Sequence, residues 1–203
     1  MIKRSSKKYI NKLFSENPNW KILDIGCGYS ADEYATTICD VEDFSSFYKN
    51  KNFVKLNDKV LPFKNEEFDF VIASHVLEHV KDATFFIKEL ERVSQRGYIE
   101  VPTILEDNLV FENKNDHIWH IEFNDIDKKI ILSKRFQYIE PILTVSSIKL
   151  LSNYFRQSLI IELEWEKTID YEIIEKNHLV NNKLSRFYLF RKFLSKLFRN
   201  IFR

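Results

Sequence analysis

The run Ile22-Leu23-Asp24-Ile25-Gly26-Cys27-Gly28 constrains the fold of this chain more than any other segment. Residues 21–25 read as a short buried strand that leads directly into a Gly-x-Gly turn. The chain has only 3 glycines in 203 residues, and two of them stand in this turn. Glycine allows the backbone to turn tightly and to approach a ligand where any Cβ would clash. The sequence therefore predicts a strand that ends at a binding site.

Further apolar runs extend this strand into an α/β fold. Strands are expected at 37–41, 53–56, 68–73 and 98–101, and an amphipathic helix at 83–93. The run 68–73 is almost uninterrupted, which is typical of a strand covered on both faces. We therefore expect a doubly wound, mostly parallel Rossmann-like sheet with helices on both faces.

The second half of the chain has a different pattern. We expect a hairpin of 118–123 with 129–132 over a polar turn, a helix at 146–155 capped by Thr144 or Ser146, and a strand at 158–165. An antiparallel hairpin or edge strand is a common addition to a parallel sheet.

Several motifs after the glycine turn stand in a fixed order. They are Asp40 at the end of the second strand, Leu61-Pro62-Phe63, Glu67–Val71, and Ala73-Ser74-His75-Val76-Leu77-Glu78-His79-Val80. With Ile22–Gly28, they make residues 20–103 resemble class I S-adenosylmethionine-dependent methyltransferases, in a type 11-like variant with a shortened first crossover. The resemblance implies methyltransferase activity with S-adenosyl-L-methionine as cofactor.

The same resemblance implies which residues bind the cofactor. The glycines would pass beneath its methionine portion, Asp24 would help to hold the ammonium group, and Asp40 would accept both ribose hydroxyls, since a carboxylate has two oxygens. Asn57 or Asp58 would contact adenine. The full expected set is Asp24, Gly26, Cys27, Gly28, Asp40, Asn57, Asp58, Ser74 and His75.

Two features depart from the family pattern. Only 12 residues separate Gly28 from Asp40, so residues 29–35 are expected to form a loop or a single turn. Asn57 stands where the family often has an acid. The pattern Gly26-x-Gly28-x-x-Ala31 also fits a nicotinamide dehydrogenase, but that fold needs a helix directly after the glycines and an acid about 20 residues onward.

Methyl transfer from a sulfonium is an in-line displacement, and a hydroxyl acceptor must also lose its proton. Candidate bases should lie near the carboxyl ends of the fourth and fifth strands. We expect His117 or His79 to be the base, with Glu100 as a third catalytic candidate. Surface positions for His79 and Glu100 are the plainer alternative. No metal site is expected, because His117 and His120 would face opposite sides of a strand.

Both ends of the chain are basic. Residues 1–14 carry five cations and residues 183–203 carry seven, all without acids, while the net charge is only +1. The acidic body between them disfavours nucleic acid as a partner. We expect a basic helical arm at 1–14, a methyltransferase domain at 15–170, and a linker with a basic amphipathic helix at 171–203.

The spacing of the tail predicts one apolar and one cationic stripe. The apolar stripe comprises Leu184, Phe187, Phe190, Leu194, Leu197, Phe198 and Ile201, and the cationic stripe Lys192, Lys196, Arg199 and Arg203. Such a helix suits an anionic membrane surface. Packing on its own domain or a partner subunit, or binding to nucleic acid, are the alternatives.

The two cysteines have no metal-binding spacing, and we find no apolar signal core or membrane-length stretch. These features favour a cytoplasmic setting. The tail would then lie at the inner face of the membrane. We expect O-methylation of a small-molecule or glycan-type acceptor. N-methylation or RNA methylation comes second. A non-catalytic alternative is a membrane-tethered partner protein that retains the cofactor fold.

Overall fold

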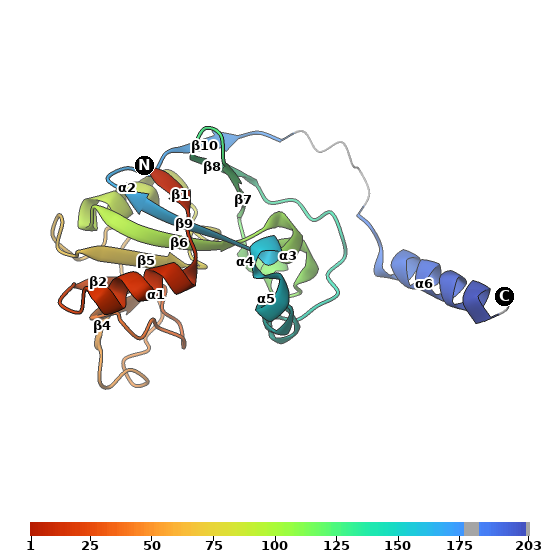
Figure 1. Cartoon of the computed structure of the whole chain (residues 1–203), viewed down its shortest axis with the longest axis horizontal. Helices are drawn as coiled ribbons and strands as arrows, with labels where there is room; N and C mark the ends of the chain where they lie inside the picture. Colours follow the sequence, from red (N-terminus) through yellow and green to blue (C-terminus); the bar gives the residue numbers. More distant parts are fainter. Residues whose placement is uncertain (177–182, 202–203) are drawn as a thin grey trace.

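The computed structural model describes residues 1–176 and 183–201 (Figure 1). Within these residues the main sheet has seven strands, in the order β1-β9-β6-β5-β2-β3-β4. They are β1 (Ile2–Arg4), β2 (Ile22–Ile25), β3 (Thr37–Asp40), β4 (Asn52–Lys55), β5 (Phe70–Ser74), β6 (Arg96–Pro102) and β9 (Ile160–Glu166). Strand β9 is antiparallel to both of its neighbours, and all other adjacent pairs are parallel. The expected mostly parallel α/β sheet is confirmed.

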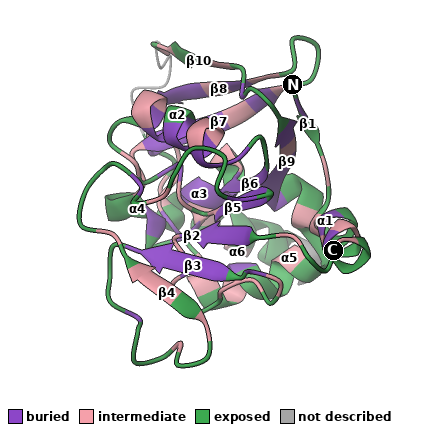
Figure 2. Ribbon diagram, turned by 90° about the vertical axis from the view of Figure 1, so that its left-hand side faces the viewer, coloured by how far each residue is buried: buried purple, intermediate pink, exposed green. Residues whose placement is uncertain are grey.

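The two faces of the sheet are covered by different helices. Successive strand residues point to opposite faces. Accordingly, Ile22 packs in the core beside α1 (Lys7–Glu16), whereas Leu23 packs in the core beside α2 (Ala83–Val93). Burial on both faces explains the long apolar run of β5, and the central strands are almost wholly buried in Figure 2.

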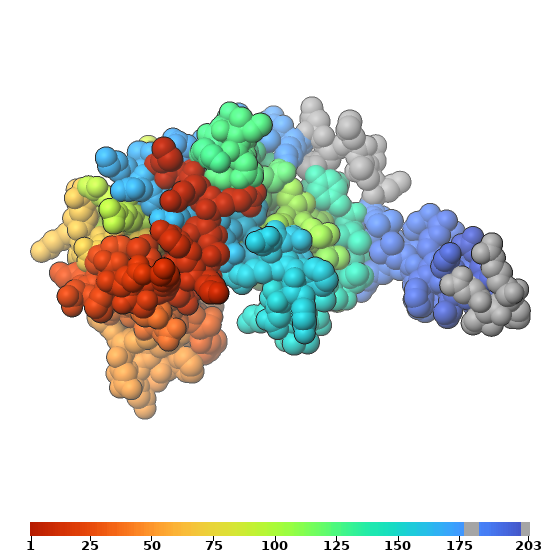
Figure 3. All heavy atoms as spheres, viewed as in Figure 1, coloured from red at the N-terminus to blue at the C-terminus, as the bar shows by residue number. Residues whose placement is uncertain are grey.

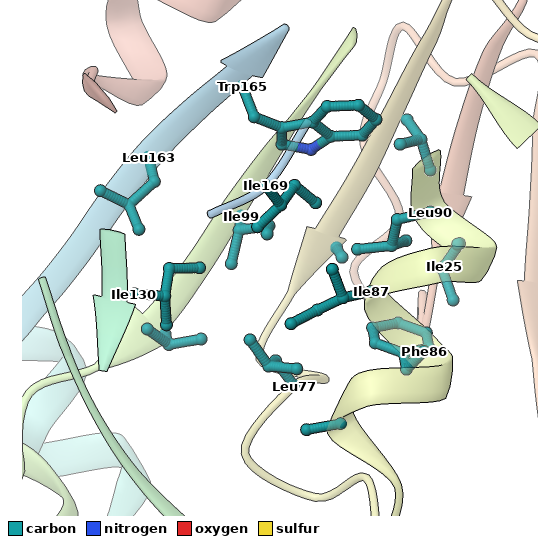
Figure 4. Close-up of a cluster of buried hydrophobic side chains, with 14 of the residues drawn as sticks. Ile25, Leu77, Phe86, Ile87, Leu90, Ile99, Ile130, Leu163, Trp165 and Ile169 are labelled. Atoms are coloured by element: carbon teal, nitrogen blue, oxygen red, sulfur yellow. The ribbon is translucent and has the colours of Figure 1, made fainter. Parts of the chain in front are cut away.

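Helix α2 has the bounds that its sequence pattern predicts. The Asp82 carboxylate accepts a hydrogen bond from the Phe85 backbone N–H, which caps the first turn. Its buried face includes Phe86, Ile87 and Leu90, which belong to the same buried cluster as Ile25 and Ile99 of the sheet (Figure 4). The spacing of three and four residues therefore describes the face that is buried.

The expected hairpin forms, but not on the edge of the main sheet. Strands β7 (Trp119–Asn124) and β8 (Lys129–Lys134) pair antiparallel, and β10 (Tyr171–Ile174) adds a parallel third strand to them. The hairpin buries Ile121 and Leu132 in the same core as α2. It therefore lies against a face of the main sheet, because its own apolar side needs that cover.

The N-terminal segment differs from the expected basic helical arm. Residues 2–4 form β1 at the edge of the main sheet, where Ile2 pairs with Trp165 and is completely buried. Helix α1 begins only after Ser6, whose side chain accepts a hydrogen bond from the Tyr9 N–H. Ile10 and Phe14 of α1 are buried as well, so residues 1–14 pack against the domain rather than stand apart from it.

The remaining helices are α3 (Ile104–Leu109), α4 (Asn113–Asp116), α5 (Val145–Leu159) and α6 (Arg186–Ile201). Thr144 rather than Ser146 caps α5. Strand β10 lies within the expected linker at 171–203, whose residues 177–182, like Arg203, fall outside the described part. Helix α6 projects away from the domain (Figures 1 and 3). Among the described helices, none combines the length and hydropathy needed to cross a bilayer.

Candidate active site

The glycine turn follows β2, which pairs with β3 on one side and with β5 on the other. Ligands of open α/β sheets bind outside the carboxyl ends of the strands at such a switch point. Gly26 and Gly28 have φ values of +69° and +47°, in the left-handed region. A Cβ on Gly26 would lie 2.5 Å from Cγ2 of Val76, whereas one on Gly28 would have nothing within 4 Å.

Two adjoining cavities, of about 660 and 760 Å³, open at this end of the sheet. Both are lined by Gly26, His75 and His79. The other expected cofactor residues divide between them: Asp24, Cys27, Gly28 and Ser74 line the first cavity, and Asp40, Asn57 and Asp58 line the second. The structure thus brings all nine expected residues around one continuous region.

The two aspartates of this region hold the loop between β2 and β3. Oδ2 of Asp24 accepts a hydrogen bond from the Asp32 N–H at 2.8 Å, and Oδ2 of Asp40 accepts one from the Gly28 N–H at 2.9 Å. No helix forms in the fully described segment 26–36, as the short spacing predicts. Burial raises the pKa of Asp24 to about 6, partly offset by its backbone hydrogen bond.

The Cys27 thiol is buried in the turn. Burial, followed by the charges of Asp40 and Asp24, raises its pKa to about 12. The thiol therefore stays protonated at neutral pH and serves as a small apolar residue rather than as a nucleophile.

His75 lies between two carboxylates. Its Nδ1 is 3.2 Å from Oε1 of Glu78, and its Nε2 is 3.4 Å from Oε1 of Glu100. Burial lowers the pKa of His75, but the hydrogen bonds to Glu100 and Glu78 outweigh it and raise the pKa to about 10. The ring is therefore charged at neutral pH and has no free nitrogen with which to accept a proton.

Glu100 is buried, which corrects the alternative that it points into solvent. Its Oε2 accepts hydrogen bonds from the Tyr98 hydroxyl at 2.7 Å and from the Arg156 guanidinium at 2.6 Å. Burial raises the pKa of Glu100, but hydrogen bonds from His75 and the charge of Arg156 outweigh it and lower the pKa to about 2. So low a pKa and so many partners argue against Glu100 as a general base.

The remaining catalytic candidates, His79 and His117, lie side by side. Their rings meet edge to face, with centroids 4.6 Å apart, and both line the first cavity. Nδ1 of His79 is 3.1 Å from the Asp116 carbonyl oxygen, and Nδ1 of His117 is 2.5 Å from Oδ1 of Asp107. His117 ends the short helix α4, before β7 begins.

Asp107 is the site residue that the sequence interpretation missed. It is buried, and its Oδ2 is 2.9 Å from Nε2 of His120 and 2.8 Å from Nε of Arg135. Burial raises the pKa of Asp107, but the hydrogen bonds from both histidines outweigh it and hold the pKa well below its usual range. His117 and His120 thus contact opposite oxygens of one carboxylate.

One local signal was available for this segment. Thr103 and Glu106 have the spacing of a helix N-terminus, and the Thr103 hydroxyl does accept a hydrogen bond from the Glu106 N–H. Helix α3 then places both Glu106 and Asp107 at the site. Burial raises the pKa of Glu106 to about 7.

Residues 23–99 match the sequence family described as a methyltransferase domain. The chain carries a class I S-adenosylmethionine-dependent methyltransferase domain. The matched region runs from β2 into β6 and includes every residue that lines the second cavity, but only 10 of the 24 that line the first. This match decides against the nicotinamide dehydrogenase interpretation.

Individual relatives of this methyltransferase domain are distant. An uncharacterized protein of Methanocaldococcus jannaschii is 29% identical over 164 residues, which cover 70% of this chain and 69% of that protein. The YcgJ protein from Bacillus subtilis is 21% identical, with a TM-score of 0.39, over 47% of this chain and 51% of that chain. This chain therefore spans about half the length of YcgJ.

A third relative has a named substrate. The 1,6-didemethyltoxoflavin-N1-methyltransferase of Burkholderia thailandensis, solved with 1,6-didemethyltoxoflavin and S-adenosylhomocysteine, is 14% identical. The similarity covers 80% of this chain and 77% of that chain, with a TM-score of 0.46.

Proposed function

We propose that this methyltransferase binds S-adenosylmethionine across both cavities and methylates a hydroxyl oxygen of a small-molecule or glycan-type acceptor. The observation that carries the proposal is that all nine expected residues line these two adjoining cavities. In this arrangement Asp24 pairs with the ammonium group, Asp40 accepts the ribose hydroxyls, and Asn57 and Asp58 face adenine.

The first cavity supplies the acceptor side of the proposal. Its wall carries Glu106 and Asp116 beside the two imidazoles. The wall also carries the cations Lys7, Lys149 and Arg156, so both hydrogen-bond donors and acceptors face the cavity. A lining of this kind suits an acceptor with several hydroxyl groups, such as a glycan, and we take it as support for O-methylation.

We place activation of the acceptor at His117 and His79. The Asp107 carboxylate contacts Nδ1 of His117 and so fixes the orientation of the ring. Nε2 is then the nitrogen that can accept the proton of a hydroxyl group. The acceptor oxygen then forms a bond to the methyl carbon, and the sulfur keeps the electron pair of the broken bond. If His117→Ala and His79→Ala both leave turnover within a few-fold, this assignment is wrong.

Calorimetric titration with S-adenosylmethionine and S-adenosylhomocysteine tests the cofactor site. We expect saturable binding that Asp40→Ala abolishes. Asp43→Ala is the matched control, because it removes a nearby exposed carboxylate that lines neither cavity. No binding at millimolar ligand would refute the enzymatic proposal and would favour a non-catalytic partner protein that keeps the fold.

We also propose that α6 lies on an anionic membrane surface, which would hold the domain at the inner face of a membrane in the cytoplasm. The helix carries five cations and no acids, and its apolar side chains Phe187, Phe190, Phe193, Leu197 and Phe198 are exposed. It projects from the domain in Figure 3, and no described residue buries these apolar side chains. Lipid headgroups and acyl chains match these two sets of side chains.

Vesicle flotation of the full chain tests the lipid proposal. We expect recovery with vesicles that contain phosphatidylglycerol but not with pure phosphatidylcholine, and loss of recovery in Phe190→Ser. Tyr154→Ser removes an exposed aromatic residue of α5 and should float as the unaltered chain does. Equal recovery of Phe190→Ser and the unaltered chain, or binding of RNA in place of vesicles, would contradict the proposal.

A further inference from the structure

Two histidines in the wall of the first cavity and one buried glutamate beside them have the composition of a metal site. Glu78, His79 and His117 each offer one ligand atom, and these atoms all lie within 4.8 Å of one another. The first two are adjacent in sequence, and the third comes from the end of α4. In the sequence His117 is nearer to His120, three residues on, but in the structure its ring lies against that of His79.

Both imidazoles present the same nitrogen. Nδ1 of His79 faces the Asp116 carbonyl oxygen, and Nδ1 of His117 faces Asp107. These contacts fix the tautomer that keeps the proton on Nδ1, which leaves Nε2 of each ring with its lone pair available. A carboxylate behind a ligating histidine, as Asp107 stands behind His117, is the usual support of a metal-bound imidazole.

Glu78 supplies the observation that points to a cation. Its side chain is completely buried, and Oε1 is 3.2 Å from Nδ1 of His75. Oε2 has no hydrogen-bond partner among the described residues. A buried acceptor left without a partner is costly, and a bound cation would remove that cost.

The backbone holds the three ligands in place. The Glu78 carbonyl oxygen accepts hydrogen bonds from the Ile118 N–H at 2.8 Å and the Trp119 N–H at 3.3 Å. The segment after β5 is therefore tied to the segment after α4. Zinc ligands at about 2.0–2.1 Å from the metal lie closer together than 4.8 Å, so the side chains need to move inward by about 1 Å at most.

We propose that Glu78, His79 and His117 bind a divalent transition metal ion that faces the first cavity and activates the acceptor hydroxyl. Two imidazoles with one carboxylate suit Zn²⁺, Mn²⁺ or Fe²⁺ and leave coordination positions open for a substrate oxygen. The catalytic part of this inference rests on the proposed methyl transfer, whereas metal binding stands by itself.

With the metal bound, His79 and His117 act as ligands and not as bases, so the ion replaces the imidazole base that the metal-free site would use. The acceptor hydroxyl coordinates the ion and releases its proton to solvent, since coordination lowers the pKa of a bound hydroxyl. The oxygen lone pair forms the new bond to the methyl carbon. The sulfur–methyl bond breaks, and its electron pair stays on sulfur as the thioether.

Titration of the metal-free full chain with Co²⁺ tests the site, because nitrogen ligands give this ion a visible absorption band. We expect saturable binding of one Co²⁺ ion per chain and displacement by Zn²⁺. Glu78→Gln and His79→Ala should each weaken binding at least tenfold. Glu112→Gln removes an exposed carboxylate from the same cavity wall and should leave binding within about threefold.

Absence of a saturable band at millimolar Co²⁺ would overturn the proposal, as would equal binding by Glu78→Gln, His79→Ala and the unaltered chain. Urea unfolding of each variant checks that it is folded. Calorimetry with S-adenosylmethionine on the same samples separates the two proposals. Cofactor binding without metal binding would refute only the metal site, whereas metal binding without cofactor binding would refute only the methyltransferase mechanism.

Discussion

The glycine turn allows a prediction that separates backbone strain from steric clash. Gly26→Ala places a non-glycine residue in the left-handed region, which costs about 1–2 kcal/mol. Its Cβ would also lie 2.5 Å from Cγ2 of Val76, and such overpacking costs about 1–3 kcal/mol. We therefore expect Gly26→Ala to lower the free energy of unfolding by about 2–5 kcal/mol. Gly28→Ala has the strain without the clash and should cost about 1–2 kcal/mol.

Val76→Ala tests the steric part directly. It removes both methyl groups, and the nearest remaining side-chain atom, Cβ of residue 76, is 3.7 Å from the new methyl group, an ordinary contact. In that background Gly26→Ala should cost only about 1–2 kcal/mol, as Gly28→Ala does. The double-mutant cycle should therefore give an interaction energy of about 1–3 kcal/mol between positions 26 and 76.

Urea unfolding followed by tryptophan fluorescence supplies the four free energies of the cycle. If Gly26→Ala costs the same with and without Val76, the clash does not explain why glycine is needed there. A second readout is cofactor affinity. The Cβ of Gly28→Ala would extend into open space of the first cavity, so this variant should lose more affinity for S-adenosylmethionine than its stability loss explains.

Three further predictions concern the buried groups of the domain. Burial raises the pKa of Asp24 from 3.8 to about 6, so the folded protein holds this proton more tightly than the unfolded chain does. The free energy of unfolding should therefore fall by about 3 kcal/mol as pH rises through the range from about 4 to 6. Urea unfolding at several pH values should show this slope, and Asp24→Asn should lack it. The pKa of Glu100 is lowered from 4.5 to about 2, so this carboxylate should instead add about 3 kcal/mol to the free energy of unfolding above pH 4.5. Acid titration should show that this gain is lost as pH falls to about 2. Glu100→Gln should abolish this dependence of stability on pH. Gly97→Ala would place its Cβ 2.6 Å from the Val71 carbonyl oxygen and 2.6 Å from Nε1 of Trp165, so thermal unfolding should show a loss of about 1–3 kcal/mol.

Local patterns were enough to predict the elements that frame the active site. The strand before Gly26, helix 83–93 and the hairpin over 124–127 follow from residue periodicity and turn composition, which act over a few residues. The motif order also placed all nine expected cofactor residues around the two cavities. Each of these features follows either from residues that are close together in the sequence or from the resemblance to a known family.

Tertiary packing decided what periodicity does not encode. No local pattern indicates that Ile2 anchors an edge strand beside β9, or that the hairpin covers a sheet face, because both depend on which apolar surfaces meet. The same holds for Asp107, which joins His117 and His120 only when α3 packs near the start of β7. Whether a histidine is a base, a metal ligand or a surface residue depends on such neighbours, which lie tens of residues apart in the chain and meet only in the folded structure.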